Sequence, residues 1–233
     1  MTDSPGLEKQ VALIFKEAWA TRAGQKAPEP EELILGNQAV VFDAATILYA
    51  DLTGSTHLVD SEDWTFAAEI YKAYLHCAAT IIRSEGGAIV SYDGDRIMGV
   101  FIGDVQATPA ARSGLKINHA VQKIINPALA AQYPLKPFRV SQVVGIDTSP
   151  IRAARTGVRG HNDLVWIGRA ANYAAKLTDL KLAERTWLTK ASYDRLHEDL
   201  KTNGSPRQSM WKPYSWSQMN NHQIYGSTWT WTA

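Results

Sequence analysis

The sequence lacks the features that would place a chain in an oxidising compartment or in a membrane. It holds one cysteine, Cys77, so it cannot form an internal disulfide, and we expect a core thiol at that position. No run of about 18 apolar residues occurs that could span a membrane. The amino terminus has no basic segment followed by an apolar one. We therefore expect a soluble, cytoplasmic protein without a membrane partner.

A strong excess of charge of either sign is also missing. The 233 residues include 24 Lys and Arg against 23 Asp and Glu, a net charge of +1. Long-range attraction to nucleic acid is therefore not expected, and a polyanionic ligand has to be bound by a few local groups. Hydrophobic residues make up 45% of the chain, which is enough for one globular domain with a substantial core.

The apolar pattern predicts a mixed α/β chain in two parts. Residues 1–35 are expected to hold a helix that begins at Ser4-Pro5 and buries one face, followed by a linker. Residues 36–233 are expected to form the main domain, including an aromatic-rich extension over about 205–233. The expected elements of its first half are a strand to 51, a helix from 61 to 86, a hairpin over 88–101 and a helix over 108–127. Those of its second half are a strand over 138–147, a protruding arm or β-hairpin over 150–162, a buried strand over 164–167, a helix over 169–180, a strand at 187–188, a helix over 190–200 and closing strands at 214–216 and 223–225.

Two aspartates are expected to meet although they are far apart in the sequence. Asp51 ends an apolar run that has the length of a buried strand. Asp95 follows Asp93-Gly94, a strong hairpin signal between two β-rich runs. If the hairpin pairs beside the strand, the two carboxylates lie close together and repel each other unless a cation lies between them. Divalent cations with oxygen ligands also bind phosphate oxygens, so the pair predicts phosphoryl transfer.

Two further groups of residues are expected at this site. The turn Gly54-Ser55-Thr56 would direct backbone N–H groups towards a polyphosphate. Arg169, Asn172 and Lys176 can share one face of the predicted helix 169–180. That face would present a neutral donor and two cations to a ribose or to a developing phosphorane charge. The alternative is an ordinary solvated helix face.

Three sequence blocks in this order resemble the catalytic domain of class III nucleotidyl cyclases, the adenylate and guanylate cyclase family. The blocks are Tyr49–Thr56, Gly94–Phe101 and Trp166–Leu177, and the resemblance runs from Val41 to about Leu177 and more weakly to Tyr225. It implies a ferredoxin-like βαββαβ palm with a central, mainly antiparallel sheet. It also implies a head-to-tail homodimer.

By this resemblance, Asp51 and Asp95 hold two divalent ions, Mn²⁺ or Mg²⁺, and the Leu52 carbonyl completes one shell. Asn172 matches the residue that orients the ribose. Lys176 is at the position where the family usually has an arginine that stabilises the transition state. Lysine keeps the positive charge but cannot donate the two parallel hydrogen bonds of a guanidinium. The metals would come from one subunit and Asn172 and Lys176 from the other, which implies two composite sites.

The residues expected to read the base depart from the purine cyclases of the family. Ser91 and Val165 occupy the positions of the adenine-reading pair, and neither can make those hydrogen bonds. Tyr49 and Arg96 flank the metal ligands and could fill the space beside a pyrimidine and bind its carbonyl oxygens. The alternative is that Tyr49 packs in the core and Arg96 is a surface charge.

This pattern resembles the pyrimidine cyclases of bacterial antiphage signalling, whose cyclic nucleotide activates a separate effector. We therefore expect a uridylate cyclase that uses UTP, because the donor Arg96 suits the two carbonyl acceptors of uracil. Cytidylate or adenylate cyclase activity and a catalytically silent nucleotide-binding relative are the alternatives. The expected substrate-binding residues are Tyr49, Thr53, Gly54, Ser55, Thr56, Ser91, Arg96, Val165 and Arg169.

Overall fold

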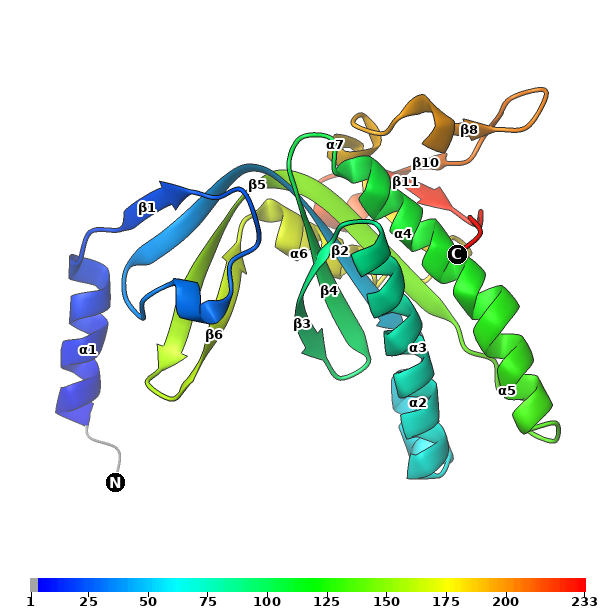
Figure 1. Ribbon diagram of the computed structural model, residues 1–233, viewed down its shortest axis with the longest axis horizontal. Helices are drawn as coiled ribbons and strands as arrows, with labels where there is room; N and C mark the ends of the chain where they lie inside the picture. Colours follow the sequence, from blue (N-terminus) through cyan, green and yellow to red (C-terminus); the bar gives the residue numbers. More distant parts are fainter. Residues whose placement is uncertain (1–3) are drawn as a thin grey trace.

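The computed structural model describes residues 4–233 (Figure 1). Its helices are α1 Ser4–Lys16, α2 Ser55–Ser61, α3 Trp64–Ser84, α4 Ala107–Ala120, the π-helical segment η2 Val121–Ile125, α5 Asn126–Gln132, α6 Arg169–Leu177 and α7 Lys190–Tyr193, with short 3-10 turns at η1 Pro30–Glu32, η3 Glu198–Leu200 and η4 Ser217–Met219. Its strands are β1 Ala20–Ala23, β2 Gln38–Leu52, β3 Ala88–Asp93, β4 Arg96–Ile102, β5 Gln142–Val158, β6 His161–Ile167, β7 Thr186–Thr189, β8 Thr202–Asn203, β9 Gln208–Ser209, β10 Lys212–Trp216 and β11 His222–Ser227.

One sheet organises the molecule and confirms the predicted fold class. Its strand order is β10-β11-β7-β5-β2-β4-β3, with β1 added beside β2 and β6 beside β5. The elements β2, α3, β3, β4, α4 and β5 form a βαββαβ unit, and its four strands lie in the order β5-β2-β4-β3. The pairs within this unit are antiparallel, whereas β5 and β7 are parallel.

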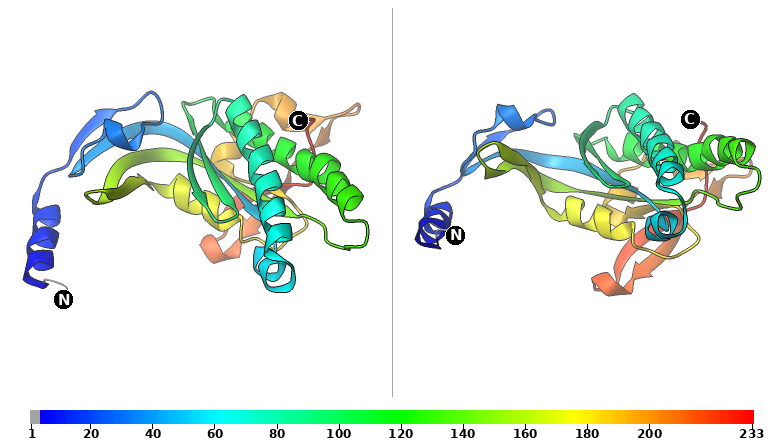
Figure 2. Two further views of the ribbon diagram at one scale, coloured as in Figure 1. Left: turned by 60° about the horizontal axis from the view of Figure 1, so that its bottom comes forward. Right: turned by 90° about the horizontal axis from the view of Figure 1, so that it is seen from below.

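Helices cover both faces of the sheet, as Figure 2 shows. α3 and α4 lie on one face and bury apolar side chains at helical spacing, including Ile70, Tyr74 and Ala78 of α3. α6 lies on the other face and buries Ala170 and Ala174 among its small residues. Each face of the sheet therefore has its own core.

The carboxyl-terminal aromatic residues complete the core on the α4 side. Trp211 is buried there, and its indole donates a hydrogen bond to the Leu200 carbonyl at 2.6 Å. Trp216 is buried in a separate cluster with Leu177 of α6 and Trp187 of β7. The Trp231 amide donates to the Leu115 carbonyl of α4 at 3.2 Å. Cys77 of α3 is half-buried against the same core, and burial raises the pKa of its thiol. Cys77 therefore has the core position that the sequence predicts, and Trp211, Trp229 and Trp231 pack against the same core.

Several predicted element ends were wrong. The helix expected to end at Pro127 continues to Gln132, because Pro127 falls in the first turn of α5, where its missing N–H costs little. The strand expected over 138–147 begins at Gln142 and runs on to Val158, since it continues into the hairpin expected as an arm. Two helices are shorter than expected. α6 ends at Leu177, and the helix expected over 190–200 consists only of α7 and the turn η3.

Two expectations about burial, one for the first helix and one for residues 164–167, were also wrong. α1 forms, but it buries no residue within the chain, and Phe15 is 85% exposed. β1 follows α1 just before the expected linker and pairs in parallel with β2, and the linker ends in the 3-10 turn η1. β6 is not a buried strand, because it pairs only with β5 and leaves Ile167 46% exposed. No helix within residues 4–233 is long and apolar enough to cross a membrane.

The close approach of α6 to the sheet requires a glycine on β5. A Cβ atom added to Gly145 would lie 2.1 Å from the Ala174 carbonyl oxygen and 2.7 Å from the Leu177 Cβ, both in α6. Neither atom belongs to the flexible end of a side chain. Any residue other than glycine at this position therefore pushes the helix away from the sheet.

We predict that Gly145→Ala lowers the free energy of unfolding by about 1–3 kcal/mol, because a methyl group has to be accommodated in a packed interface. Urea denaturation followed by circular dichroism measures the change. Gly36→Ala is the control, since an added Cβ there meets nothing within 4 Å, and its effect should stay within about 0.5 kcal/mol. Equal stabilities of the two variants would contradict this account of the α6 contact.

Candidate active site

Two carboxylates lie at the ends of neighbouring strands. Asp51 is near the end of β2, and Asp95 is in the turn that joins β3 to β4. The register of β2 on β4 pairs Ala50 with Ile97, so Asp51 lies beside the start of β4 and next to that turn. Both side chains are half-buried. The hairpin argument from the sequence therefore predicted their juxtaposition correctly.

The electrostatics of this pair favour a bound cation. Burial, and after it the charge of Asp95, raises the pKa of Asp51 to about 6, while the Arg96 guanidinium lowers it. Within residues 4–233, Asp95 Oδ2 is a buried oxygen without a hydrogen-bond partner. Asp51 and Asp95 are therefore two neighbouring carboxylates, and one of their oxygens has no hydrogen-bond partner within the described chain. A divalent ion bound between them would neutralise their repulsion and would accept that oxygen as a ligand.

The protein supplies only part of a metal shell here. No group of three or more His, Cys, Asp and Glu side chains gathers as a metal site among the described residues. Asp51 and Asp95, with the backbone carbonyl of Leu52 that the sequence motif predicts, leave coordination positions for oxygen atoms of a ligand. This incomplete shell fits ions that bind together with a polyphosphate.

Two tyrosines of α3 line the site, and the sequence analysis did not identify them. Tyr74 is fully buried, and its hydroxyl has no hydrogen-bond partner within the described chain. Burial, and after it the charges of Asp51 and Asp95, raises the pKa of Tyr74 well above its usual value. Burial, and after it the charge of Asp95, also raises the pKa of Tyr71. Both tyrosines fit the apolar stripe of a helix, so the sequence carries no separate signal for them.

The chain after Asp51 forms the predicted turn. Gly54 has φ +78°, in the left-handed region that favours glycine, and α2 begins at the next residue. The Thr53 amide donates to the Ser141 carbonyl at 2.8 Å, which holds the turn against the chain that leads into β5. Thr53 and Thr56 are exposed and Ser55 is half-buried. The polar groups of the turn therefore lie on the surface beside the carboxylates.

Tyr49 and Arg96 contact each other next to Asp51. The Arg96 guanidinium lies 5.6 Å from the centroid of the Tyr49 ring, and it forms an ion pair with Asp93 at 3.3 Å. Tyr49 is half-buried, and burial raises the pKa of its hydroxyl. The two residues therefore lie against each other, and Tyr49 also packs against the core on the α6 face of the sheet.

Asn172 and Lys176 lie on the outer side of α6. α6 buries Ala170, Ala174 and Leu177 towards the sheet, which leaves Asn172 and Lys176 exposed. The Lys176 ammonium is 3.8 Å from the Met219 sulfur. Among residues 4–233, no hydrogen bond or ion pair joins either side chain to Asp51 or Asp95. One copy of the chain therefore presents the carboxylates and the α6 pair as two separate groups.

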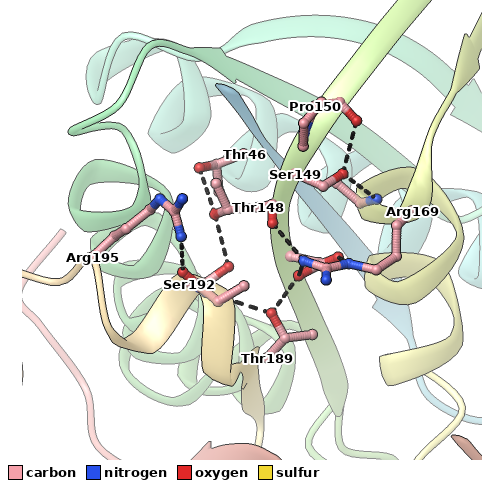
Figure 3. A network of polar contacts seen from close by, with 11 residues as sticks. Thr46, Thr148, Ser149, Pro150, Arg169, Thr189, Ser192 and Arg195 are labelled. Atoms are coloured by element: carbon pink, nitrogen blue, oxygen red, sulfur yellow. Dashed lines mark hydrogen bonds and ion pairs between the residues drawn. The ribbon is translucent and has the colours of Figure 1, made fainter. Parts of the chain in front are cut away.

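In the described part of the chain, Arg169, Ser91 and Val165 do not join the group formed by Tyr49 and Arg96. The Arg169 guanidinium is bound by Asp147 of β5, so it is directed into the chain (Figure 3). Ser91 is half-buried on β3, opposite Met98, and Val165 is 38% exposed on β6. β5, β2 and β4 lie between β6 and β3. The structure of one chain does not bring Ser91 and Val165 together.

Comparisons with known proteins give a consistent result. No family model matches the chain. It is 50% identical over 229 residues to a uridylate cyclase of Burkholderia cepacia, covering 97% of both chains. It is 34% identical over 233 residues to a uridylate cyclase of Rhodovulum sp. (strain MB263), covering 98% of this chain and 97% of the relative.

Among solved structures, the adenylyl cyclase CyaB from P. aeruginosa superposes with a TM-score of 0.68 and 21% identity, over 81% of this chain and 95% of that chain. The guanylate cyclase domain of RhGC from Catenaria anguillulae superposes with a TM-score of 0.65 and 14% identity, over 82% of this chain and 99% of that chain. These two likenesses show the fold.

The raised pKa of Asp51 predicts a pH-dependent stability in the absence of divalent ions. The folded protein holds a proton on Asp51 up to about pH 6, whereas the unfolded chain releases it near 3.8. Stability therefore falls as the pH rises through this interval and stays lower above it. We expect Asp51→Asn to have a higher Tm than the wild type above pH 6 in EDTA, and an equal Tm near pH 4.

Thermal unfolding at several pH values measures this difference, and Asp93→Asn, which neutralises an aspartate with an 80% exposed side chain in the same hairpin, is the control. Mn²⁺ should raise the Tm of the wild type more at pH 7.5 than at pH 5, because binding requires the ionised carboxylate. Parallel curves for the wild type and Asp51→Asn at all pH values would refute the assignment.

Proposed function

Because the chain belongs to the family of uridylate cyclases and has the class III cyclase fold, we propose that it converts UTP to 3′,5′-cyclic UMP and pyrophosphate. The resemblance to class III nucleotidyl cyclases is thereby confirmed, and the chain is a nucleotide cyclase. The observation that carries the proposal is the pair Asp51 and Asp95, half-buried at adjacent strand ends, with an unpartnered carboxylate oxygen.

Asp51, Asp95 and the Leu52 carbonyl would hold two divalent ions, Mn²⁺ or Mg²⁺. Bound there, such ions neutralise phosphate charge and lower the pKa of a ribose hydroxyl. The turn at Gly54 would place the Ser55 and Thr56 amides against the β- and γ-phosphates, because the first amides of a helix have no partner within it. The 3′ oxygen of the ribose attacks the α-phosphorus in line, and the bond to the pyrophosphate oxygen breaks.

Asn172 and Lys176 would complete the site from a second copy of the chain. Asn172 orients the ribose, and the Lys176 ammonium stabilises the charge that develops on the α-phosphate. Their exposure on the outer side of α6, without contact to Asp51 or Asp95 of the same chain, supports a site shared between two subunits. The proposed assembly is therefore a homodimer with two composite sites.

Tyr49 and Arg96 would select the base. Their contact places a donor and an aromatic ring beside the metal ligands. The small Ser91 and the apolar Val165 supply none of the hydrogen bonds that a purine-reading pair makes. A pyrimidine leaves room for the Tyr49 ring, and the two carbonyl oxygens of uracil accept hydrogen bonds from Arg96. This arrangement favours UTP over CTP.

The product would act as a signal in the cytoplasm. The sequence pattern resembles pyrimidine cyclases of bacterial antiphage signalling, and we extend that role to this chain. A separate effector protein would respond to the cyclic nucleotide, as the resemblance to those signalling cyclases implies.

Purified protein with Mn²⁺ or Mg²⁺ should release pyrophosphate fastest from UTP when ATP, GTP, CTP and UTP are supplied separately. Asp51→Ala and Asp95→Ala should each lower kcat more than about 100-fold, because bound ions stabilise the transition state by several kcal/mol. Circular dichroism should show that both variants remain folded. Full activity in either variant would refute the metal site, and a preference for ATP or GTP would refute the base assignment.

Arg96→Ala should lower the ratio of kcat/KM for UTP to that for CTP by about 10-fold, since a hydrogen bond from a charged group contributes about 1.5–3 kcal/mol. The ratio is the informative quantity because Arg96 also influences Asp51. Asp93→Ala is the matched control, because it removes the ion-pair partner of Arg96 and keeps the guanidinium. An unchanged ratio in Arg96→Ala would mean that Arg96 does not read the base.

A further inference from the structure

A buried carboxylate on β5 holds the first residue of α6. Asp147 is fully buried, and the Arg169 guanidinium donates to both of its oxygens, from Nε to Oδ2 at 2.9 Å and from Nη2 to Oδ1 at 3.1 Å (Figure 3). Arg169 Nη2 also donates to the Thr148 carbonyl at 2.7 Å, and the Thr189 hydroxyl donates to Asp147. The ion pair is thus fixed by several directional hydrogen bonds.

The second residue of α6 is attached to the same strand. The Ala170 amide donates to Ser149 Oγ at 3.0 Å, and Ser149 Oγ donates to the Pro150 carbonyl at 3.0 Å. Asp147 and Ser149 are two residues apart on β5, so their side chains lie on the same face of the strand. The first turn of α6 is therefore anchored to β5 at two successive positions.

The polar network continues across the sheet. Thr148 Oγ1 lies 2.9 Å from Thr46 Oγ1 of β2 and 2.9 Å from Ser192 Oγ of α7. Figure 3 shows this chain of hydroxyl groups beside the ion pair. The anchor of α6 thus belongs to a set of buried hydrogen bonds that joins α6 to β2, β5 and α7.

The remaining contacts of the first turn of α6 with the sheet are apolar. They are made by Ala170, Ala171 and Ala174, whose small side chains restrict rotation and sliding of a helix weakly. Farther along α6, Tyr173 packs edge-on against Trp216 of β10 and His222 of β11. Asn172 and Lys176 follow Arg169 by three and seven residues on the same short helix. A change in the position of the first turn therefore moves both side chains.

Burial of an ion pair is by itself a poor source of stability, since its desolvation offsets most of the attraction. The two hydrogen bonds from the Arg169 guanidinium to Asp147 do fix the distance and the orientation of the first residue of α6 relative to β5. We propose that Asp147 is a positioning residue: by binding Arg169 it sets the start of α6, and so places Asn172 and Lys176 for the site of the partner subunit. This inference rests on the proposed function, because it needs those two residues to act in catalysis.

Asp147→Asn tests the inference, because it keeps the shape of the side chain and removes its charge. The Arg169 side chain is 38% exposed and can be solvated when its partner is neutral. We expect kcat to fall about 10- to 100-fold with little change in KM, since small misplacements of catalytic groups have effects of this size. The Mn²⁺-induced rise in Tm should be kept, because Asp51 and Asp95 are untouched.

Mixed dimers identify the half of the site that the variant damages. Asp51→Ala mixed with Lys176→Ala is the reference pair, and it should recover about a quarter of the wild-type activity, because half of the dimers are mixed and each has one intact site. Asp147→Asn should recover activity with Asp51→Ala in the same way. It should recover none with Lys176→Ala, because both of these changes affect the α6 half.

Thr46→Val is the matched control, because it removes a hydroxyl at the other end of the network without touching α6. It should lower Tm and keep kcat near the wild-type value. If Asp147→Asn does not fold, Arg169→Lys replaces it, since the charge stays and the fork is lost. The same loss of kcat and the same mixing pattern are expected.

Wild-type kcat in Asp147→Asn would overturn the inference, and so would recovery with Lys176→Ala or a lack of recovery with Asp51→Ala. Equal losses of kcat in Thr46→Val and Asp147→Asn would also overturn it, because the effect would then be one of general stability. No recovery in the reference pair contradicts the composite site itself. In that case the role of Asp147 in positioning α6 is decided by the Asp147→Asn variant alone, from its kcat, its KM and its Mn²⁺-induced rise in Tm.

Discussion

The repulsion between two half-buried carboxylates is the constraint on which this site depends. The hydrogen bonds of the sheet fix the register of β2 on β4, so Asp51 and Asp95 stay close whether or not a cation is bound. Without a cation, the repulsion and the burial are relieved by proton uptake, which is why the pKa of Asp51 rises to about 6. With a divalent cation, the ionised pair becomes the favourable state, and the backbone has already been ordered for it.

The sheet also explains why one chain does not form a complete site. Tyr71 and Tyr74 reach the carboxylates from α3 on one face, whereas α6 covers the other face. Because α6 packs its apolar side on the sheet, Asn172 and Lys176 have to point outwards. Asp51 follows Tyr49 on the face of β2 that packs against α6, so it is the outward direction of Asn172 and Lys176 that keeps them from the carboxylates of the same chain. The pairing of two copies is the simplest way to join the two groups.

Precision and stability have different sources in this fold. Stability comes from the apolar cores on the two faces of the sheet, including the aromatic residues near the carboxyl terminus. Precision at α6 comes from a few buried polar contacts, those of Asp147 and Ser149, and from the close approach permitted by Gly145. Apolar packing is non-directional, so a helix that carries functional side chains benefits from contacts with defined geometry.

Local signals determined much of what the sequence alone could show. The Asp93-Gly94 hairpin, the strand that ends at Asp51 and the turn at Gly54 each depend on residues close together in the chain, and all three were predicted correctly. The sequence blocks that contain them also indicated the cyclase family, which the relatives confirm.

Contacts between distant segments were decided only by the tertiary structure. Arg169 meets Asp147 across 22 residues, Tyr74 approaches both carboxylates from a helix, and α1 leaves its apolar side uncovered within the chain. Periodicity identifies which side of a helix is apolar, but it does not identify what lies opposite. The partner of a side chain is set by strand order and helix placement, which the local sequence does not encode.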